Sequence, residues 1–170
     1  MISPTKLRIV FLTSIVMAGN CLAQSPAEAP RYFHLDFAVK ELESGKVINA
    51  RAYSMTISTG DTGGSSIRAG NKLPSSTGGS GPGSLTYIDV GVNIDCRAAK
   101  EIQDQLALNV AAEISSLATD PSSSILPLVR QTKWSSNVIV PIRKPTTIFS
   151  SDDPTTKRQT QLELTAIPIK

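Results

Sequence analysis

The sequence predicts an all-β or nearly all-β fold, an antiparallel curled sheet or sandwich of about seven or eight strands. Segments in which apolar and polar residues alternate recur along the chain, and this period of two is typical of half-buried strands. Clusters of Gly, Pro, Asn, Asp and Ser separate these segments, as turns do in β proteins. The chain has 170 residues, and residues 31–170 are enough for one domain around a single core.

The first two predicted strands flank a turn signal at Glu43-Ser44-Gly45. The segment 32–39 alternates strictly, and so does the segment 53–57. The apolar positions on the core face of the two strands are Phe33, Leu35, Phe37, Val39, Tyr53, Met55 and Ile57. These two strands are predicted to form a hairpin.

The apolar pattern also predicts the register of this hairpin, because directly opposed residues lie on the same face of a sheet. A two-residue loop would place Tyr53 opposite the polar face of its partner. A three-residue loop opposes Leu35 to Tyr53 and Phe33 to Met55, which directs both apolar stripes to the core. Its third position favours a left-handed residue, so a bulge is predicted at Gly45.

The remaining strands follow from the same alternation. A short strand is predicted over residues 66–69, and the clearest strand of the chain over residues 85–96. The polar segment 97–105 is predicted to be a turn or one helical turn. The Ala-rich segment 106–114 also suits a helix, but we assign it to a strand because its period is two and its neighbours are strands. Further strands are predicted over residues 137–142, 146–149 and 161–169.

Gly, Ser and Pro residues predict the loops and the strand ends. Residues 74–84 form a Gly/Ser-rich segment that we expect to be a disordered loop. It is not a phosphate loop, because no Gly-Lys-Ser/Thr sequence follows it. Pro141 and Pro168 indicate strand ends or edge strands. At least one edge of the fold is expected to be open to pairing with another chain.

The N-terminus has the three parts of a secretory signal peptide. Lys6 and Arg8 precede an apolar segment that is too short to span a membrane, and cleavage is expected after Ala23. Residues 1–23 are therefore the predicted signal peptide and residues 24–30 a flexible leader, and we predict no transmembrane helix in the mature chain. A lipidated Cys21 is the alternative, although Asn20 stands where such signals have a small residue.

Charge and cysteine content narrow the classes of function. The net charge is +3, but removal of Lys6 and Arg8 leaves fifteen basic against fourteen acidic residues. No Lys/Arg cluster suggests contact with phosphates, so nucleic acid is not an expected partner. Cys96 has no partner for an internal disulfide once Cys21 is removed.

An ordered set of segments resembles the β-domain of secretins, the outer-membrane rings of secretion and pilus machines. The segments are SIRAGNKLP, TYIDVGVNID, LALNVAAEISSLA, PLVRQTKWSSNVIVP and LELTAIPIK, which follow one another over residues 66–170. The resemblance implies the fold of the secretin wall domain. It also implies self-association or docking with a secretion or pilus assembly, in the periplasm or at the outer membrane.

The sequence departs from the secretin pattern in two places. Secretins carry several ring-building domains before the β-domain, where this chain has one hairpin. Secretins also have a long excursion with a membrane-facing hairpin at the position of residues 150–161, which here read SSDDPTTKRQTQ. This segment is too short for two transmembrane strands of about ten residues each. The resemblance therefore implies a small exported bacterial protein with a truncated domain.

Most chemistry-bearing residues have a structural interpretation. His34, the single histidine, lies on the polar face of a strand, where a solvated side chain is favoured over a catalytic base. Asp152 and Asp153 precede Pro154 and are predicted to cap a turn rather than to bind calcium. We expect no catalytic, cofactor or metal site.

Several residues of the remaining strands have a second interpretation. Cys96 continues an apolar face and is predicted to be buried. Trp134 is predicted to pack in the core, with an interface anchor as the alternative. Tyr87, on the other face of its strand, is the second candidate interface residue. Asp89 and Asp95 share that face, and we expect them to be solvated rather than to form a sugar or cation site.

The sequence thus predicts an exported, non-enzymatic envelope protein that docks with itself or with a secretion or pilus assembly by pairing of sheet edges. The alternative is a monomeric exported β-sandwich that binds a ligand or a surface. A hydrolase is disfavoured, because no set of nucleophile, base and orienting residue is recognisable.

Overall fold

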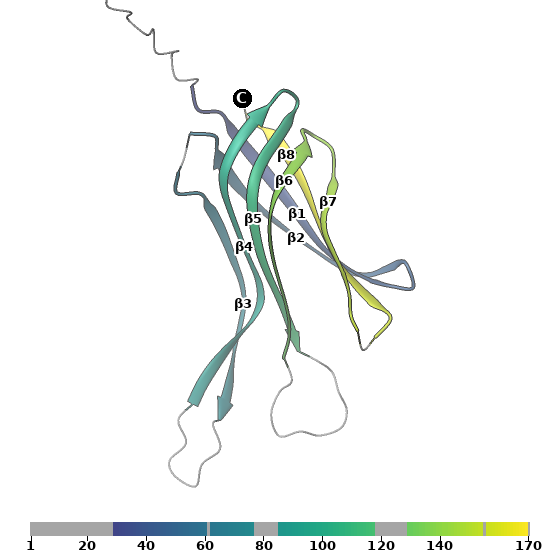
Figure 1. The fold of residues 1–170 in the computed structure, drawn as a ribbon. Helices are drawn as coiled ribbons and strands as arrows, with labels where there is room; N and C mark the ends of the chain where they lie inside the picture. Colours follow the sequence, from purple (N-terminus) through teal and green to yellow (C-terminus); the bar gives the residue numbers. More distant parts are fainter. Residues whose placement is uncertain (1–28, 61, 77–84, 118–128, 155, 170) are drawn as a thin grey trace, which may run out of the picture.

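The protein is a sandwich of two antiparallel four-stranded sheets in the computed structural model (Figure 1), which describes residues 29–60, 62–76, 85–117, 129–154 and 156–169. This architecture confirms the predicted fold class and the upper limit of the predicted strand number. The predicted signal peptide, and the leader up to residue 28, lie outside the described residues.

Sheet A combines the first two and the last two strands of the chain, and sheet B contains the four strands between them. The first sheet, here sheet A, has the order β2 (Lys46–Ser58), β1 (Tyr32–Glu43), β8 (Arg158–Pro168) and β7 (Thr146–Asp152). The second, sheet B, has the order β3 (Ser65–Ser76), β4 (Leu85–Ile102), β5 (Gln105–Leu117) and β6 (Val129–Pro141). All strand neighbours within the sheets pair in antiparallel fashion.

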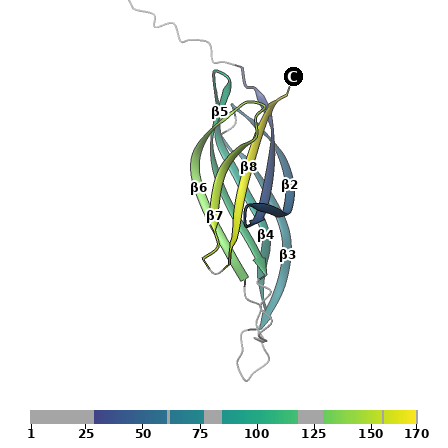
Figure 2. The ribbon, with the colours of Figure 1, turned by 90° about the vertical axis from the view of Figure 1, so that its right-hand side faces the viewer.

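The core lies between the two sheets and consists of the inward-facing residues that the alternation predicts. Burial of these apolar side chains is the main stabilising contribution in such a layer. The largest fully buried side chains are Phe33, Phe37, Leu35, Ile57, Ile94, Leu106, Leu162, Leu164, Val39, Val92, Val110 and Val140. Figure 2, turned by 90°, shows the two sheets facing each other along the length of these strands.

The β1–β2 hairpin forms as predicted, but its predicted register is wrong by two residues. Leu35 lies opposite Met55 rather than Tyr53. The turn has two residues, Ser44 and Gly45, both with positive φ, and the bulge lies within β2, where Ile48 is the extra residue. The bulge restores the alignment that a two-residue turn alone would shift by one residue, so both apolar stripes still face the core.

The strands β3 and β4 are longer than predicted. β3 runs through Lys72 and Pro74 to Ser76, and the rest of the predicted loop, residues 77–84, lies outside the described residues. β4 continues to Ile102, so the prediction of a turn or helical turn over residues 97–105 is corrected. A bulge with Ala98 in the left-handed region interrupts the period of two there, and this hid the strand in the sequence.

The other strands are found where they were predicted, with longer extents. The Ala-rich segment is strand β5, and β7 contains the predicted strand 146–149, whereas β6 and β8 end one residue before the predicted strands 137–142 and 161–169 do. Pro141 ends the edge strand β6 and Pro168 ends β8, in agreement with the prediction. Among the described residues, no helix is long and apolar enough to cross a membrane.

Sheet B divides into two hairpins at Gly91. The pairing of β4 with β5 begins at Val92↔Ile114, whereas β3 and β4 stay paired down to Ser76↔Leu85. Figure 1 shows the lower ends of β3 and β4 leaving β5 and β6. We call the paired residues 71–76 and 85–90 the β3–β4 arm.

Candidate interaction surface

The described side chains form no recognisable catalytic or metal centre. No group of three or more His, Cys, Asp or Glu residues within the described ranges is placed to hold a metal ion. His34 and Asp36 lie one pleat apart on the outer face of sheet A, with 3.0 Å between Nε2 and Oδ1, and both side chains are more than 40% exposed. The edges and faces of the sandwich are therefore the candidate functional features.

Each sheet has two edges, and the edges of the two sheets lie together in pairs. On one side, β2 approaches β3, and the Ser65 hydroxyl donates a 2.6 Å hydrogen bond to the carbonyl oxygen of Thr56. On the other side, β6 approaches β7, and the rings of Trp134 and Phe149 lie 5.5 Å apart. The sandwich thus has one lateral side formed by β2 and β3 and another formed by β6 and β7.

The strand directions make these two lateral sides complementary. Because each sheet contains four antiparallel strands, β2 runs opposite to β7, and β3 runs opposite to β6. If one copy placed its β2 and β3 beside the β7 and β6 of the next copy, both antiparallel ladders would continue. Neither edge in either sheet has a second strand partner within the described chain.

Three of the four edge strands have features that limit pairing with another chain. β3 carries Arg68, Lys72 and Pro74, β2 contains a bulge, and β7 has seven residues. Charges, prolines, bulges and short strands reduce unselective pairing of exposed edges. These features limit unselective pairing at the lateral sides of the sandwich.

The two predicted interface residues lie in different surroundings. Trp134 is half-buried on the inner face of β6 and packs against the core, as the core interpretation predicted. Tyr87 is 59% exposed on β4, opposite Pro74 in the β3–β4 arm. The structure does not bring these two residues together, since Tyr87 belongs to the arm and Trp134 to the body of the sandwich. Whether either contacts a partner stays a prediction.

The other acidic residues that the sequence suggested as site candidates form ion pairs with nearby basic residues. Asp95 receives two hydrogen bonds from Arg68, 2.7 and 2.9 Å long, and Asp89 pairs with Lys72 at 3.0 Å. Asp153 pairs with Arg130 of sheet B at 2.8 Å. The carboxylates of β4 therefore point to different partners rather than to a shared site.

Cys96 is fully buried in the core, as predicted. Desolvation by burial, with a smaller effect of the Asp95 charge, raises the pKa of its thiol from 9.0 to about 12. A thiol that stays protonated at neutral pH is a poor nucleophile. This environment favours a packing role for Cys96.

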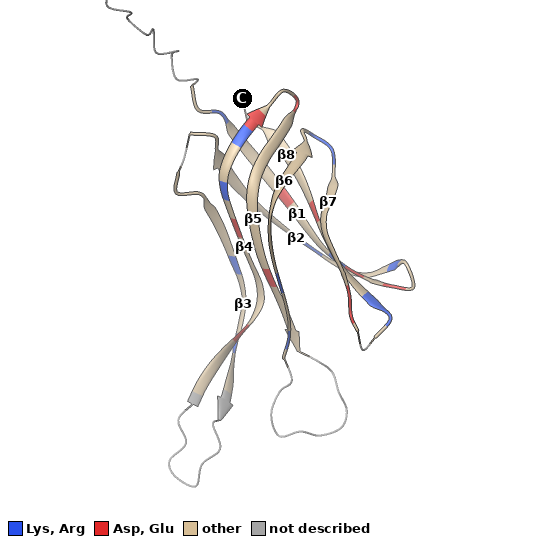
Figure 3. Ribbon diagram, in the orientation of Figure 1, with Lys and Arg blue, Asp and Glu red and all other residues tan. Residues whose placement is uncertain are grey.

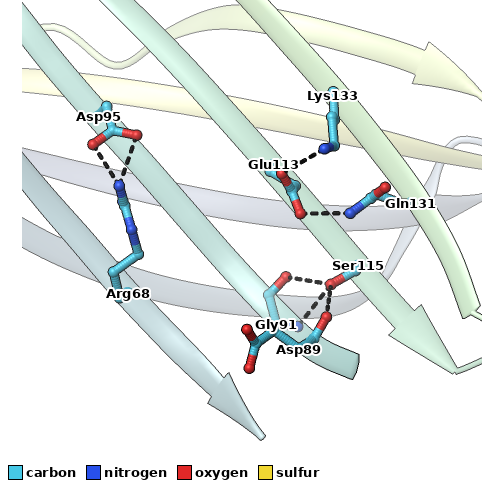
Figure 4. A network of polar contacts seen from close by, with 8 residues as sticks. All are labelled: Arg68, Asp89, Gly91, Asp95, Glu113, Ser115, Gln131 and Lys133. Carbon is cyan, nitrogen blue, oxygen red and sulfur yellow. Dashed lines mark hydrogen bonds and ion pairs between the residues drawn. The ribbon is translucent and has the colours of Figure 1, made fainter. Parts of the chain in front are cut away.

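A polar network crosses the outer face of sheet B (Figure 4). Glu113 of β5 binds both Lys133 and Gln131 of β6. Next to it, the buried Ser115 hydroxyl accepts a 2.9 Å hydrogen bond from the Gly91 N–H, at the position where β4 separates from β5. The close approach of backbones explains the glycine, because a Cβ on Gly91 would lie 2.1 Å from the Ala69 oxygen.

The lower end of the sandwich contains a charged cleft between the two sheets. It has a volume of about 450 Å³, and Glu41, Ser116, Arg130, Asp153 and Arg158 are among its lining residues. Sequence reasoning missed this cleft, although Glu41 continues the inward alternation of β1. Arg51, one pleat beyond Tyr53 on β2, pairs with Glu41 at 3.1 Å and points inward in the same way.

Comparison with known proteins identifies the class of fold. Neither protein-family models nor the sequences of curated proteins give a significant match to this chain. Among solved structures, the chain is similar to the Salmonella SPI-1 type III secretion injectisome secretin InvG, with a TM-score of 0.53 and 11% identity over 83% of this chain and 64% of that chain.

Two further structures of the same Salmonella protein give the same result. The chain is similar to the atomic model of the SPI-1 injectisome basal body proteins InvG, PrgH and PrgK, with a TM-score of 0.53, 11% identity and coverage of 83% of this chain and 45% of that chain. For the InvG secretin domain β-barrel, the TM-score is 0.50 at 11% identity, over 83% of this chain and 62% of that chain. The chain thus spans less than two thirds of each of these secretin chains.

The fold is therefore secretin-like, which confirms the resemblance in the sequence at the level of the fold. At 11% identity the similarity carries no residue of a functional site from one chain to the other.

Proposed function

We propose that this chain is an exported, non-enzymatic cell-envelope protein whose secretin-like β-domain docks by pairing of sheet edges, with further copies of itself or with a secretion or pilus assembly. The observation that carries the proposal is the complementarity of the two lateral sides. Each presents one edge from each sheet, and the strand directions permit both ladders to continue into a neighbour. The secretin-like fold and the predicted signal peptide support the location in the periplasm or at the outer membrane.

Docking of this kind has a defined geometry. A contact between the β2/β3 side of one copy and the β6/β7 side of the next is heterologous, so it produces a ring or an open chain rather than a two-fold dimer. Backbone hydrogen bonds would supply the affinity, and the charged side chains along the edges would select the partner. The proposal requires no cofactor and no nucleic acid.

The native mass of the protein tests this proposal. We would extract the protein gently from the envelope with detergent and measure its mass by light scattering. A large, discrete particle is the expected result and would justify imaging for a ring. A monomer that also fails to co-purify with any envelope component would overturn docking.

A pair of proline substitutions on β6 makes the test specific. Consecutive residues of an edge strand direct their N–H groups alternately to the neighbouring strand and to solvent. Of Ser135→Pro and Ser136→Pro, one will therefore break a hydrogen bond to β5 and lower the melting temperature, and the other will leave the fold intact. The variant with the unchanged melting temperature should lose the assembly. Retention of the full native mass by that variant would exclude pairing through β6.

A monomeric exported sandwich that binds a ligand or a surface is the second candidate, and the cleft between the sheets favours it. The cleft volume of about 450 Å³ lies in the range of small-molecule sites. Its lining residues Glu41, Arg130 and Arg158 would suit a polar ligand with both charge signs. The same mass measurement separates the candidates, because this function requires a free monomer.

A further inference from the structure

The two edge strands of the β2/β3 lateral side carry charges of one sign. β2 contains Lys46 and Arg51, β3 contains Arg68 and Lys72, and neither strand contains Asp or Glu. The carboxylates that pair with three of these bases lie on the next strands inward, β1 and β4. Figure 3 shows the blue positions of β3 beside the red positions of β4. A strand added to either of these edges would therefore lie next to a strand whose charged side chains are all basic.

The bases of β3 lie on one face of an open strand edge. Arg68 and Lys72 are four residues apart, and the side-chain period of a strand is two, so both lie on the outer face of sheet B. Their side chains are 54% and 70% exposed, whereas Ile67 on the inner face packs against the core. β3 is the outermost strand of its sheet, and β4 is its one strand neighbour within the described chain. The segment 66–72, which the structure describes throughout, is thus free to pair with a further strand.

Both bases are paired, yet each has donors for a second carboxylate. Nη2 of Arg68 donates to the two carboxylate oxygens of Asp95, at 2.7 and 2.9 Å, and Nη1 donates to the Ile67 carbonyl oxygen at 2.8 Å. The Lys72 ammonium pairs with Asp89 at 3.0 Å. A guanidinium has five N–H donors and an ammonium three. Ion pairs at this exposure contribute little to stability, so their geometry can adjust to a partner.

The opposite lateral side of a second copy does not offer matching charges. β6 contains Arg130 and Lys133 and no acidic residue, and Lys133 lies on the outer face, as Arg68 and Lys72 do. Asp152 is the acidic residue of β7, but β7 belongs to sheet A. Opposite charges across a strand pair are stabilising and like charges are destabilising. Charge therefore favours a different protein over a second copy at the edge of β3.

We propose that the edge of β3 binds an extended segment of another protein that carries two acidic residues four positions apart. Residues at this spacing lie on one face of an added strand, and both would stand opposite the bases Arg68 and Lys72 in either strand direction. An apolar residue between them, opposite Ala69, would extend the buried layer. This inference rests on the docking proposed above and selects, of its two kinds of partner, another protein rather than a further copy.

Binding of synthetic peptides to the full chain, as purified from the envelope, tests the proposal. The probes are two dye-labelled peptides of nine residues in which Thr and Val alternate, with Glu at the third and seventh positions of one and Gln at those positions of the other. Fluorescence anisotropy at low salt should show the Glu peptide binding about tenfold more tightly, because two opposite-charge pairs form across the strands. Added salt should remove most of this difference.

Single substitutions test where the peptide binds. Lys72→Gln and Arg68→Gln should each weaken binding of the Glu peptide about two- to fivefold and leave binding of the Gln peptide unchanged. Lys133→Gln is the matched control, because Lys133 is also an exposed base on an edge strand of sheet B and pairs with Glu113 of the next strand at 3.1 Å. The control should bind both peptides as the wild type does, and all three variants should keep the wild-type melting temperature.

Four results would overturn the inference: no binding of the Glu peptide, equal binding of the two peptides, an equal loss in the Lys133→Gln control, or amide NMR signals that shift in β6 rather than in β3. Failure of the docking itself is a separate outcome, which the native mass reports. An assembly whose mass and composition are unchanged in Lys72→Gln and Arg68→Gln would contradict only the acidic partner. A monomer that co-purifies with no envelope component would contradict the docking.

Discussion

The β1–β2 hairpin and the β3–β4 arm both extend beyond the core, but their neighbours differ. β1 pairs with β8 down to Glu43↔Arg158, so the β1–β2 hairpin has a third strand beside it almost to its turn. β4 loses β5 at Gly91, so the β3–β4 arm continues as two strands. The turn of the hairpin with the third strand lies between Glu43 and Lys46, whereas the charges of the arm are the Lys72–Asp89 pair near its base.

This difference suggests that the two hairpins have different roles. A strand paired on both sides contributes to the cooperative core, whereas a two-stranded extension adds little to the global free energy of unfolding. We therefore expect the free energy of unfolding to depend on β1 and its neighbours more than on the arm. Substitutions in the two regions should separate these roles.

The largest expected effect is that of Phe37→Ala in β1. Phe37 is 1% exposed, and truncation of a buried Phe leaves a cavity that lowers the free energy of unfolding by about 3–5 kcal/mol. Tyr87→Ala in the arm should change it by less than about 0.5 kcal/mol, as surface substitutions do. Urea unfolding followed by circular dichroism measures both values. Similar losses in the two variants would show that the arm belongs to the cooperative core.

A smaller effect is expected for Gly91→Ala, at the position where the arm leaves sheet B. The new Cβ would meet the backbone oxygen of Ala69 at 2.1 Å, and that oxygen cannot move without disturbing the β3–β4 pairing. We expect a loss of about 3 kcal/mol. Gly45→Ala in the β1–β2 turn is the control, because its Cβ would have nothing within 4 Å and only the φ of +80° is unfavourable, at about 1 kcal/mol.

Amide hydrogen exchange would locate the effect of the glycine substitution. Loss of protection confined to β3 and the lower part of β4 is expected for Gly91→Ala. If Gly91→Ala were no more destabilising than Gly45→Ala, the close backbone approach would not be what requires glycine at the division of sheet B.

The sequence predicted the body of the sandwich better than its irregular parts. Strict alternation identified β1, the middle of β2 and β4, and the core face of each, because burial on one face imposes a period of two. The register of the first hairpin was wrong because Ile48 forms a bulge that no local pattern indicates. The end of β4 was missed for the same reason at Ala98.

The candidate surfaces were predictable only in part. The exposure of Tyr87 and the burial of Cys96 follow from the face of β4 on which each lies. The division of sheet B at Gly91 could not be predicted, since it depends on where β5 stops pairing with β4. The same holds for the Ser115 hydrogen bond, which depends on the register of β4 and β5, and for the cleft, whose lining comes from both sheets.

The last expected effect is absent at neutral pH and concerns the upper part of β4. Cys96 lies where β4 is paired on both sides, opposite Ser65 and Val110. Its folded pKa of about 12 exceeds the ordinary value of 9.0, so the unfolded chain loses the thiol proton first as the pH rises. The stabilising contribution is therefore complete below about pH 9 and is lost progressively up to about pH 12, at no more than about 1.4 kcal/mol per pH unit.

Comparison of the wild type with Cys96→Ala isolates this contribution. The variant should be less stable at pH 7 because of the cavity, but its free energy of unfolding should fall less steeply between pH 9 and the highest pH at which both proteins fold. The native thiol should also resist alkylation at pH 8 and react once the chain is unfolded in urea. Equal pH slopes, or rapid alkylation of the native protein, would mean that the doubly paired part of β4 opens as readily as the arm, and the contrast between the two regions would fail.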